Sequence, residues 1–175
     1  MPSPGRPVEG SNQALESASL KMSVVENRLK ELGVTLPPPA TPAGSYVQYT
    51  RAGNTVYLSG HLPKNADGEL ATGTVGKDVE VEVAAAAART VAINLISTMK
   101  AAAGDLDKVK VLKLTGFVNS ADDFMGQPAV INGASNFMVD AFGPEQGAHA
   151  RSAVGVNTLP LGVCVEIEAI IEVLP

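Results

Sequence analysis

The stretch that decides the fold is HARSAVGV at residues 149–156, followed by the turn NTLPLG at 157–162 and by VCVEIEA at 163–169. Both runs alternate in polarity and the segment between them contains Pro and Gly, so the pattern predicts an antiparallel hairpin. Side chains of a strand point alternately to its two faces. The aliphatic residues of the second strand therefore share the face that meets the core: Val163, Val165, Ile167, Ala169, Ile171 and Val173.

The charged side chains of this predicted hairpin gather on the opposite face. Pairing Val156 with Val163 places Arg151 opposite Glu168 and diagonal to Glu166, within reach of long side chains. A guanidinium and carboxylates then converge away from the core. From the hairpin alone, this arrangement fits a cross-strand ion pair and a binding site for a carboxylate equally well.

Strands and helices are predicted to alternate along the rest of the chain. Ser23 and Glu26 form a capping box for a short helix that ends at Gly33. The other expected elements are strands at 46–50, 55–61 and 109–118 and helices at 79–103 and 128–142. This order predicts an α+β fold, a sheet with both long helices on one face.

The terminal stretch also resembles a known family. Ala-Arg-Ser-x-Val at 150–154, the Leu-Pro turn at 159–160 and Val-x-Val-Glu-Ile-Glu-Ala at 163–169 are similar to motifs of the reactive intermediate deaminase (Rid) family, also described as the endoribonuclease L-PSP or translation-inhibitor-like family. The resemblance runs from about residue 46 to residue 173 through further segments: YVQ at 46–48, GNTVYLSGHLP at 53–63, FV at 117–118, DDF at 122–124 and VIN at 130–132. The extended front end at 25–33 looks like a longer-chain branch of that family.

The resemblance implies an architecture and a pair of central residues. It implies a chorismate-mutase-like mixed sheet and a homotrimer with sites between subunits. In this family the arginine that matches Arg151 binds the carboxylate of a small imino or enamino acid. The glutamate that matches Glu166 positions or activates water, and an acid near a desolvated interface can have a raised pKa. Glu168 is expected to be an ion-pair partner or a solvated residue.

Four further residues match the ligand pocket of the family. Tyr46 and Ser59 supply hydroxyls, although a sheet tyrosine often serves packing and a serine before glycine often serves a turn. Asn132 matches a family asparagine across a stretch that carries extra residues. At Ala153 many Rid proteins have a cysteine; the only cysteine here, Cys164, does not match that position. The alanine excludes thiol chemistry there, while its backbone N–H remains available.

The composition limits which partners and which cellular compartment we expect for the protein. We expect one domain at 22–175, preceded at 1–21 by a polar leader or an added segment. The net charge of −5 and the 4% of aromatic residues give no basis for binding nucleic acid. No apolar run reaches the roughly 20 residues that span a bilayer, so no membrane partner is expected. The cytoplasm is the expected compartment, with a mitochondrial presequence as the alternative.

Metal and cofactor sites are not expected. His61 and His149 are the only histidines, and no Cys/His spacing suits a metal. His149 precedes the arginine motif and either lines the pocket or lies in a surface loop. No phosphate-binding loop or dinucleotide fingerprint is present.

The residues and the family resemblance leave three candidate functions. The first is hydrolytic deamination of a 2-imino or enamino acid to a 2-oxo acid and ammonia, with a small carboxylate-bearing metabolite as substrate and no cofactor. The second is an endoribonuclease or translation inhibitor, which would require His61 and His149 to meet. The third is a non-catalytic trimer that only binds carboxylate metabolites, a reading that Ala153 keeps open.

Overall fold

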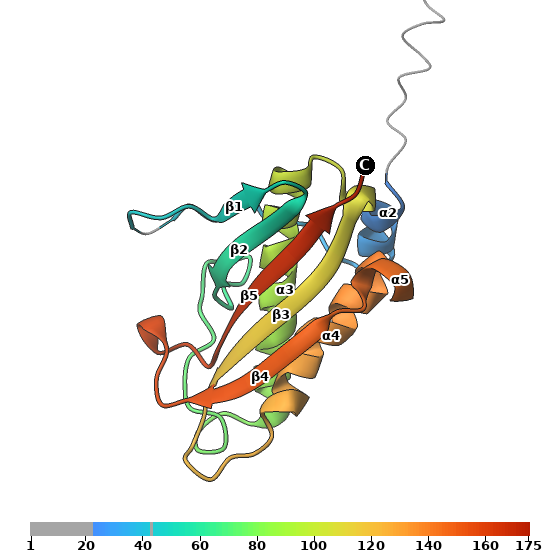
Figure 1. The fold of residues 1–175 in the computed structure, drawn as a ribbon. Helices are drawn as coiled ribbons and strands as arrows, with labels where there is room; N and C mark the ends of the chain where they lie inside the picture. Colours follow the sequence, from blue (N-terminus) through green and yellow to red (C-terminus); the bar gives the residue numbers. More distant parts are fainter. Residues whose placement is uncertain (1–22, 43) are drawn as a thin grey trace, which may run out of the picture.

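A single sheet carries all the strands of the described chain. The structure, a computed structural model, describes residues 23–42 and 44–175, so the predicted leader at 1–21 lies outside the described residues. The strands of this part of the chain are β1 (Tyr49–Ala52), β2 (Thr55–His61), β3 (Val109–Asn119), β4 (Ala150–Val156) and β5 (Val165–Val173). Their order across the sheet is β1-β2-β5-β3-β4 (Figure 1).

Two long helices, α3 (Val81–Ala103) and α4 (Gln127–Phe142), pack against the same face of this sheet (Figure 1). This confirms the predicted mixed α+β class. The strand predicted at 46–50 begins only at Tyr49, whereas the other predicted elements are present to within about two residues. The shorter described elements are α2 (Val24–Glu31), α5 (Pro144–Gly147) and the 3-10 turns η1 (Leu106–Lys108) and η2 (Pro160–Gly162).

Small residues allow the helices to approach each other and the sheet closely. A Cβ added at Gly133 of α4 would lie 1.9 Å from the carbonyl oxygen of Ala85 in α3, and one added at Gly116 of β3 would lie 2.4 Å from Ile131 Cδ1. By length and composition α3 could cross a membrane, but half of its most apolar window is buried inside the protein. That burial is what we expect of a core helix.

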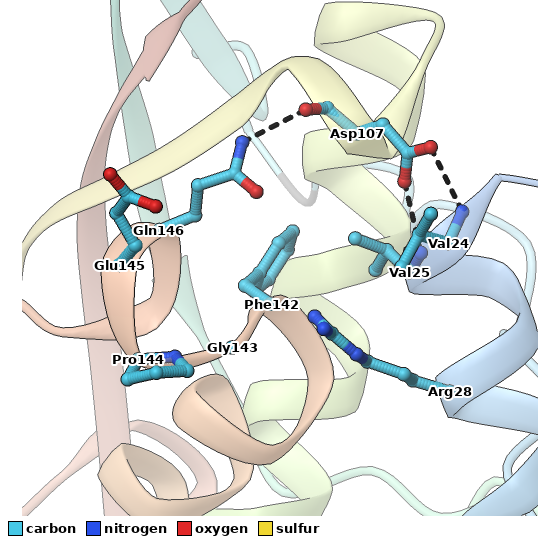
Figure 2. Close-up of a pocket in the computed structure, with 9 residues that line it drawn as sticks. All are labelled: Val24, Val25, Arg28, Asp107, Phe142, Gly143, Pro144, Glu145 and Gln146. Atoms are coloured by element: carbon cyan, nitrogen blue, oxygen red, sulfur yellow. Dashed lines mark hydrogen bonds between the residues drawn. The ribbon is translucent and has the colours of Figure 1, made fainter.

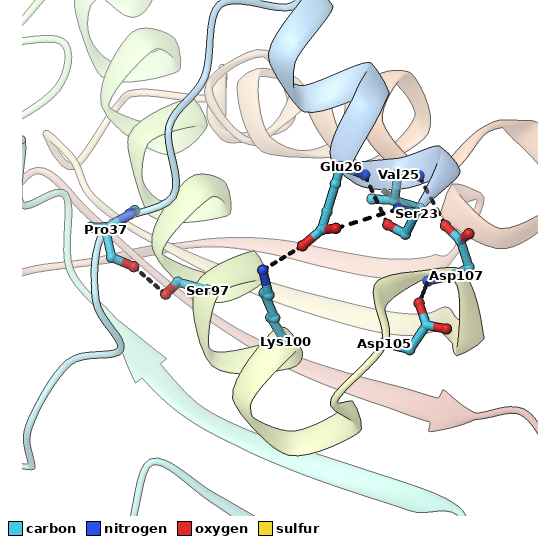
Figure 3. A network of polar contacts seen from close by, with 8 residues as sticks. All are labelled: Ser23, Val25, Glu26, Pro37, Ser97, Lys100, Asp105 and Asp107. Carbon is cyan, nitrogen blue, oxygen red and sulfur yellow. Dashed lines mark hydrogen bonds and ion pairs between the residues drawn. The ribbon is translucent and has the colours of Figure 1, made fainter. Parts of the chain in front are cut away.

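The predicted capping box is present at the start of α2 (Figure 3). The backbone N–H of Glu26 donates to Ser23 Oγ at 3.0 Å, and the Ser23 N–H donates to the Glu26 carboxylate at 3.4 Å. The carboxylate of Asp107 in η1 accepts from the first two N–H groups of α2 at 2.8 and 2.9 Å. Lys100 of α3 forms an ion pair with Glu26. The helix ends before Gly33, whose φ of 71° suits a helix C-terminus.

The closing hairpin is the expectation that the structure contradicts. β4 pairs with β3 in parallel orientation, with Arg151 beside Leu114. β5 pairs with the other edge of β3 in antiparallel orientation, with Ala169 beside Leu114. Because β3 lies between β4 and β5, the predicted placement of Arg151 opposite Glu168 and diagonal to Glu166 is wrong.

The connection between β4 and β5 explains this difference. Strands separated by one intervening strand are roughly 10 Å apart, a distance that the segment 157–164 spans easily. Val156 pairs with Asn119 of β3, and Val163 instead forms an isolated bridge with Thr72. A strand shows the same alternation of polarity whether or not its neighbour in sequence is also its neighbour in the sheet. Alternation therefore could not reveal that β3 lies between the two strands.

The two faces of the sheet differ in their cover. On the helix-covered face, side chains such as Leu114 and Ile167 are fully buried. On the other face, which we call the open face, Tyr57 is 47% and Val154 is 43% exposed. Phe117 of β3 alternates with buried residues and belongs to this open face. Within the described part of the chain, both long helices lie on the first face and leave the open face uncovered (Figure 1).

Candidate functional site

Arg151 lies on the edge strand β4, with its side chain directed toward α4. It shares a row of the sheet with the buried Leu114, so it belongs to the helix-covered face and not, as predicted, to the opposite one. Its Nη1 donates to Asn132 Oδ1 at 2.7 Å and to Ser135 Oγ at 3.2 Å. Asn132 and Ser135 are three positions apart on α4 and so share one side of that helix. The structure thus brings Arg151 and Asn132, both predicted site residues, into direct contact.

His149 extends this group. Its Nε2 lies 3.0 Å from Ser135 Oγ, and its Nδ1 lies 2.6 Å from the carbonyl oxygen of Gly147. A carbonyl oxygen can only accept, so Nδ1 carries the hydrogen, and Nε2 of the neutral ring accepts from the Ser135 hydroxyl. We call Arg151, Asn132, Ser135 and His149 the arginine cluster. Ser135 was missed from the sequence; its helical spacing from Asn132 was the available signal.

Ala153 lies on the same face of β4 as Arg151. It stands beside Gly116 of β3 and is half-buried. Its methyl group supplies neither a nucleophile nor a proton, so any chemistry at this edge depends on other side chains. Cys164 is buried next to the start of β5, and burial raises the pKa of its thiol, which disfavours the reactive thiolate.

Glu166 lies on β5 and points to the open face, in the same row as Phe117. The side chain is half-buried. Burial raises the pKa of the Glu166 carboxyl above its ordinary value, and the negative charge of nearby Glu168 adds to this rise. None of the described residues donates a hydrogen bond that would offset this effect. A raised pKa suits a carboxylate that must accept and release a proton near neutrality.

The Glu166 carboxylate lies over the backbone of β2 at Gly60. A Cβ added at Gly60 would lie 2.1 Å from Glu166 Oε1, so any larger residue there would displace the carboxylate. The preceding Ser59 donates through Oγ to the carbonyl oxygen of Val47 at 2.7 Å. Tyr46, which was predicted to begin a strand, lies before the observed start of β1 and is 51% exposed. We call Glu166, Gly60 and Ser59 the glutamate cluster.

His61 links the glutamate cluster to helix α3 through two hydrogen bonds. It is buried, and its Nδ1 donates to the carbonyl oxygen of Ser59 at 2.7 Å. Its Nε2 lies 2.8 Å from Thr98 Oγ1 of α3. Desolvation lowers the pKa of the His61 imidazole, and the hydrogen bond to Ser59 only partly opposes this. The ring therefore serves as a neutral link behind the irregular pairing between Leu58 and His61 in β2.

The two clusters do not meet within a single chain. Arg151 and Glu166 are on strands separated by β3 and belong to opposite faces of the sheet. The predicted convergence of the two side chains on one face of a hairpin is therefore wrong for a single chain. Within one chain, the two side chains therefore cannot both contact the same small ligand.

A separate cleft of about 330 Å3 lies between α2 and α5 (Figure 2). Arg28 of α2 lies beside Gly143 there, and the Gln146 side chain donates to the carbonyl oxygen of Asp107 at 2.9 Å. None of the predicted site residues lines this cleft. Within residues 23–42 and 44–175, no group of three His, Cys, Asp or Glu side chains could hold a metal ion.

Comparison with known proteins places this geometry in a family. The family described as Endoribonuclease L-PSP matches residues 38–173. The chain is 47% identical over 157 residues to Protein TCP17 of Trypanosoma cruzi, a match that covers 86% of this chain and 98% of TCP17. It is 37% identical over 129 residues to the 2-iminobutanoate/2-iminopropanoate deaminase of Escherichia coli strain K12, covering 73% and 86% of the two chains.

A solved structure extends the likeness to three dimensions. The protein Atu1372 of Agrobacterium tumefaciens, described as having unknown function, superposes with a TM-score of 0.78 at 48% identity. The match covers 86% of this chain and 94% of that one. The family match spans both the arginine cluster and the glutamate cluster. The chain therefore belongs to the endoribonuclease L-PSP family, whose members include the reactive intermediate deaminases.

Proposed function

We propose that this protein hydrolyses small 2-imino acids, or their enamine tautomers, to 2-oxo acids and ammonia. The observation that carries the proposal is the contact between Arg151 and Asn132, which holds a guanidinium at the sheet edge with donors to spare. A guanidinium is suited to two parallel hydrogen bonds with a carboxylate. The deaminase name of the 37% identical relative supports the same substrate class.

The proposed reaction needs few groups. Water adds to the C=N carbon and one of its protons passes to the nitrogen; the hydroxyl of the resulting carbinolamine then gives up the second proton to the same nitrogen, and the C–N bond breaks to release ammonia and leave the C=O of the 2-oxo acid. Glu166 would take a proton from the attacking water and return it to the leaving nitrogen. Its raised pKa supports that role, because a catalytic base works best with a pKa near the operating pH. None of these proton transfers or bond changes requires a cofactor.

We further propose that each site lies between subunits of a homotrimer. Arg151 and Glu166 face opposite sides of one sheet, so a second copy of the chain must supply one of them. The open face supports this arrangement, because it carries Glu166 as well as the exposed Tyr57 and Val154, and the long helices leave it uncovered. The apolar part of that face would be buried by association.

Ribonuclease activity has less support. Acid–base cleavage of RNA by a pair of histidines would require His61 and His149 to meet. His61 is buried against Thr98 of α3, whereas His149 is bound to Ser135 of α4. Each imidazole already has both nitrogens engaged.

An ammonia-release assay with freshly generated 2-iminobutanoate tests the proposal, with RNA cleavage measured in parallel. We expect ammonia in step with 2-oxobutanoate, and a trimer by multi-angle light scattering at micromolar concentration. Binding of 2-oxobutanoate without any turnover of the imine would instead establish a non-catalytic carboxylate-binding protein. A monomer in solution would contradict the intersubunit site.

A further inference from the structure

The hydrogen bonds of the arginine cluster run in one direction. The carbonyl of Gly147 fixes the hydrogen of His149 on Nδ1, so Nε2 accepts from the Ser135 hydroxyl. That hydroxyl then has its lone pairs free and accepts from Arg151 Nη1 at 3.2 Å. Asn132 Oδ1 accepts from the same Nη1 at 2.7 Å.

This pattern determines which edge of the guanidinium is left for a ligand. A guanidinium has five N–H groups, two on each terminal nitrogen and one on Nε. In Arg151 both hydrogens of Nη1 are used by Ser135 and Asn132. The hydrogens on Nη2 and Nε have no acceptor among the described residues. These two nitrogens form one edge of the planar group, which matches the two oxygens of a carboxylate.

We propose that Ser135 and His149 are positioning residues that hold Arg151 so that its Nε–Nη2 edge receives the substrate carboxylate. The inference rests on the proposed function, because it names the geometry by which that site binds its substrate. His149 acts on Ser135, Ser135 acts on Nη1, and neither touches the substrate. Through this chain of hydrogen bonds the two residues hold the guanidinium in one orientation.

The Asn132 amide adds to this geometry. Because its Oδ1 faces Arg151, its Nδ2 points away from the guanidinium. Asn132 is exposed, so this NH2 group remains available to a ligand. Ser135 has no such spare hydrogen, since its hydroxyl hydrogen is directed to His149. Asn132 and Ser135 both accept a hydrogen bond from Nη1, but only Ser135 is confined to positioning the guanidinium.

The test compares Ser135→Ala with Ser135→Thr, which keeps the hydroxyl. For Ser135→Ala we expect KM for 2-iminobutanoate, and Kd for 2-oxobutanoate measured by calorimetry, to rise about tenfold, with kcat within about twofold of the parent. Ser135→Thr should restore both constants to within about threefold. His149→Phe, which removes the acceptor nitrogen, should resemble Ser135→Ala. The control Asn136→Ala changes the exposed residue next to Ser135 on α4 and should leave both constants unchanged.

A second background separates positioning from simple cross-linking of β4 to α4. In an Arg151→Ala protein, adding Ser135→Ala should change neither the residual Kd nor the residual rate, because the hydroxyl acts only through the guanidinium. An additional loss in that background, or a fall in kcat at unchanged KM in the single variant, would overturn the inference. So would parent-like constants for Ser135→Ala.

The parent protein shows which of the two proposals has failed. If the parent deaminates 2-iminobutanoate and Ser135→Ala behaves identically, the positioning role is wrong and the proposed function stands. If the parent neither binds 2-oxobutanoate nor releases ammonia, the proposed function itself is wrong, and the positioning role falls with it.

Discussion

The arginine cluster and the glutamate cluster hold their ionisable groups in opposite ways. Arg151 is fixed by hydrogen bonds to α4 of the same chain, and Ser135 there is fixed in turn by His149. Glu166 lies half-buried on the open face, beside the like charge of Glu168 and without a described hydrogen-bond donor. One charge is held in place before any ligand arrives, and the other is kept in an environment that favours its neutral form.

This difference separates binding from proton transfer. A fixed guanidinium loses little freedom when it binds a carboxylate, which favours affinity. A desolvated carboxyl with a raised pKa can both accept and release a proton near neutral pH, which favours turnover. We therefore expect changes to the arginine cluster to act on binding and changes to the glutamate cluster to act on rate.

The largest effect is expected from Arg151→Ala. Loss of the charge-assisted contact should weaken 2-oxobutanoate binding and lower kcat/KM by at least about a hundredfold. Arg151→Lys should recover little, because an ammonium cannot reproduce the planar fork. Calorimetry and the ammonia assay measure both quantities. The matched control is Arg28→Ala, in the α2–α5 cleft, which should keep parental activity; the reverse outcome would move the site to that cleft.

Glu166→Gln should affect turnover and spare binding. The amide is nearly the same shape but cannot accept the proton from water, so we expect kcat to fall about a hundredfold while Kd for 2-oxobutanoate stays within about twofold. Because the raised pKa means that ionised Glu166 destabilises the fold, the variant should also be at least as stable as the parent at pH 7.5. Equal losses of binding and turnover would break the comparison between the clusters.

Gly60→Ala tests the placement of the glutamate without touching it. The added methyl would lie 2.1 Å from Glu166 Oε1 and must displace the carboxylate. The backbone at Gly60 does not have a positive φ, so the strand itself tolerates alanine. We expect kcat to fall about tenfold with KM little changed. Circular dichroism confirms folding, and an unchanged kcat would show that the carboxylate position is not critical.

The smallest effect concerns His61 and is a matter of stability. Since burial lowers the pKa of folded His61 below the unfolded value of about 6.5, its stabilising contribution is complete above that pH. It is lost as the pH falls through the folded pKa, by at most roughly 1.4 kcal/mol per pH unit. Urea unfolding at pH 7.5 and pH 5.0 measures this, with Glu166→Gln as the background because protonation of Glu166 acts in the opposite direction. His61→Gln in that background should show a smaller pH dependence; an equal one would exclude His61 as the cause.

Several parts of the fold could be predicted because their signals are local. The Ser23–Glu26 capping box depends on residues three positions apart, and the α3 core helix depends on repeating small and apolar residues. The same holds for the alternation in β5, whose predicted core face is the one that the structure buries. Asn132 was predicted through the family resemblance, yet its contact with Arg151 could not be, since it joins a helix to a strand 19 residues later.

By itself, the sequence determined the identity of the elements, the buried face of β5 and the family of the chain, because periodicity and motifs are read within short windows. Only the tertiary structure decided that β3 lies between β4 and β5, and that Arg151 therefore faces α4 while Glu166 faces the open side. The physical reason is that a strand presents the same alternating pattern to any partner. Which partner it takes depends on the length of the connections and on the packing of the helices, and these are properties of the whole chain.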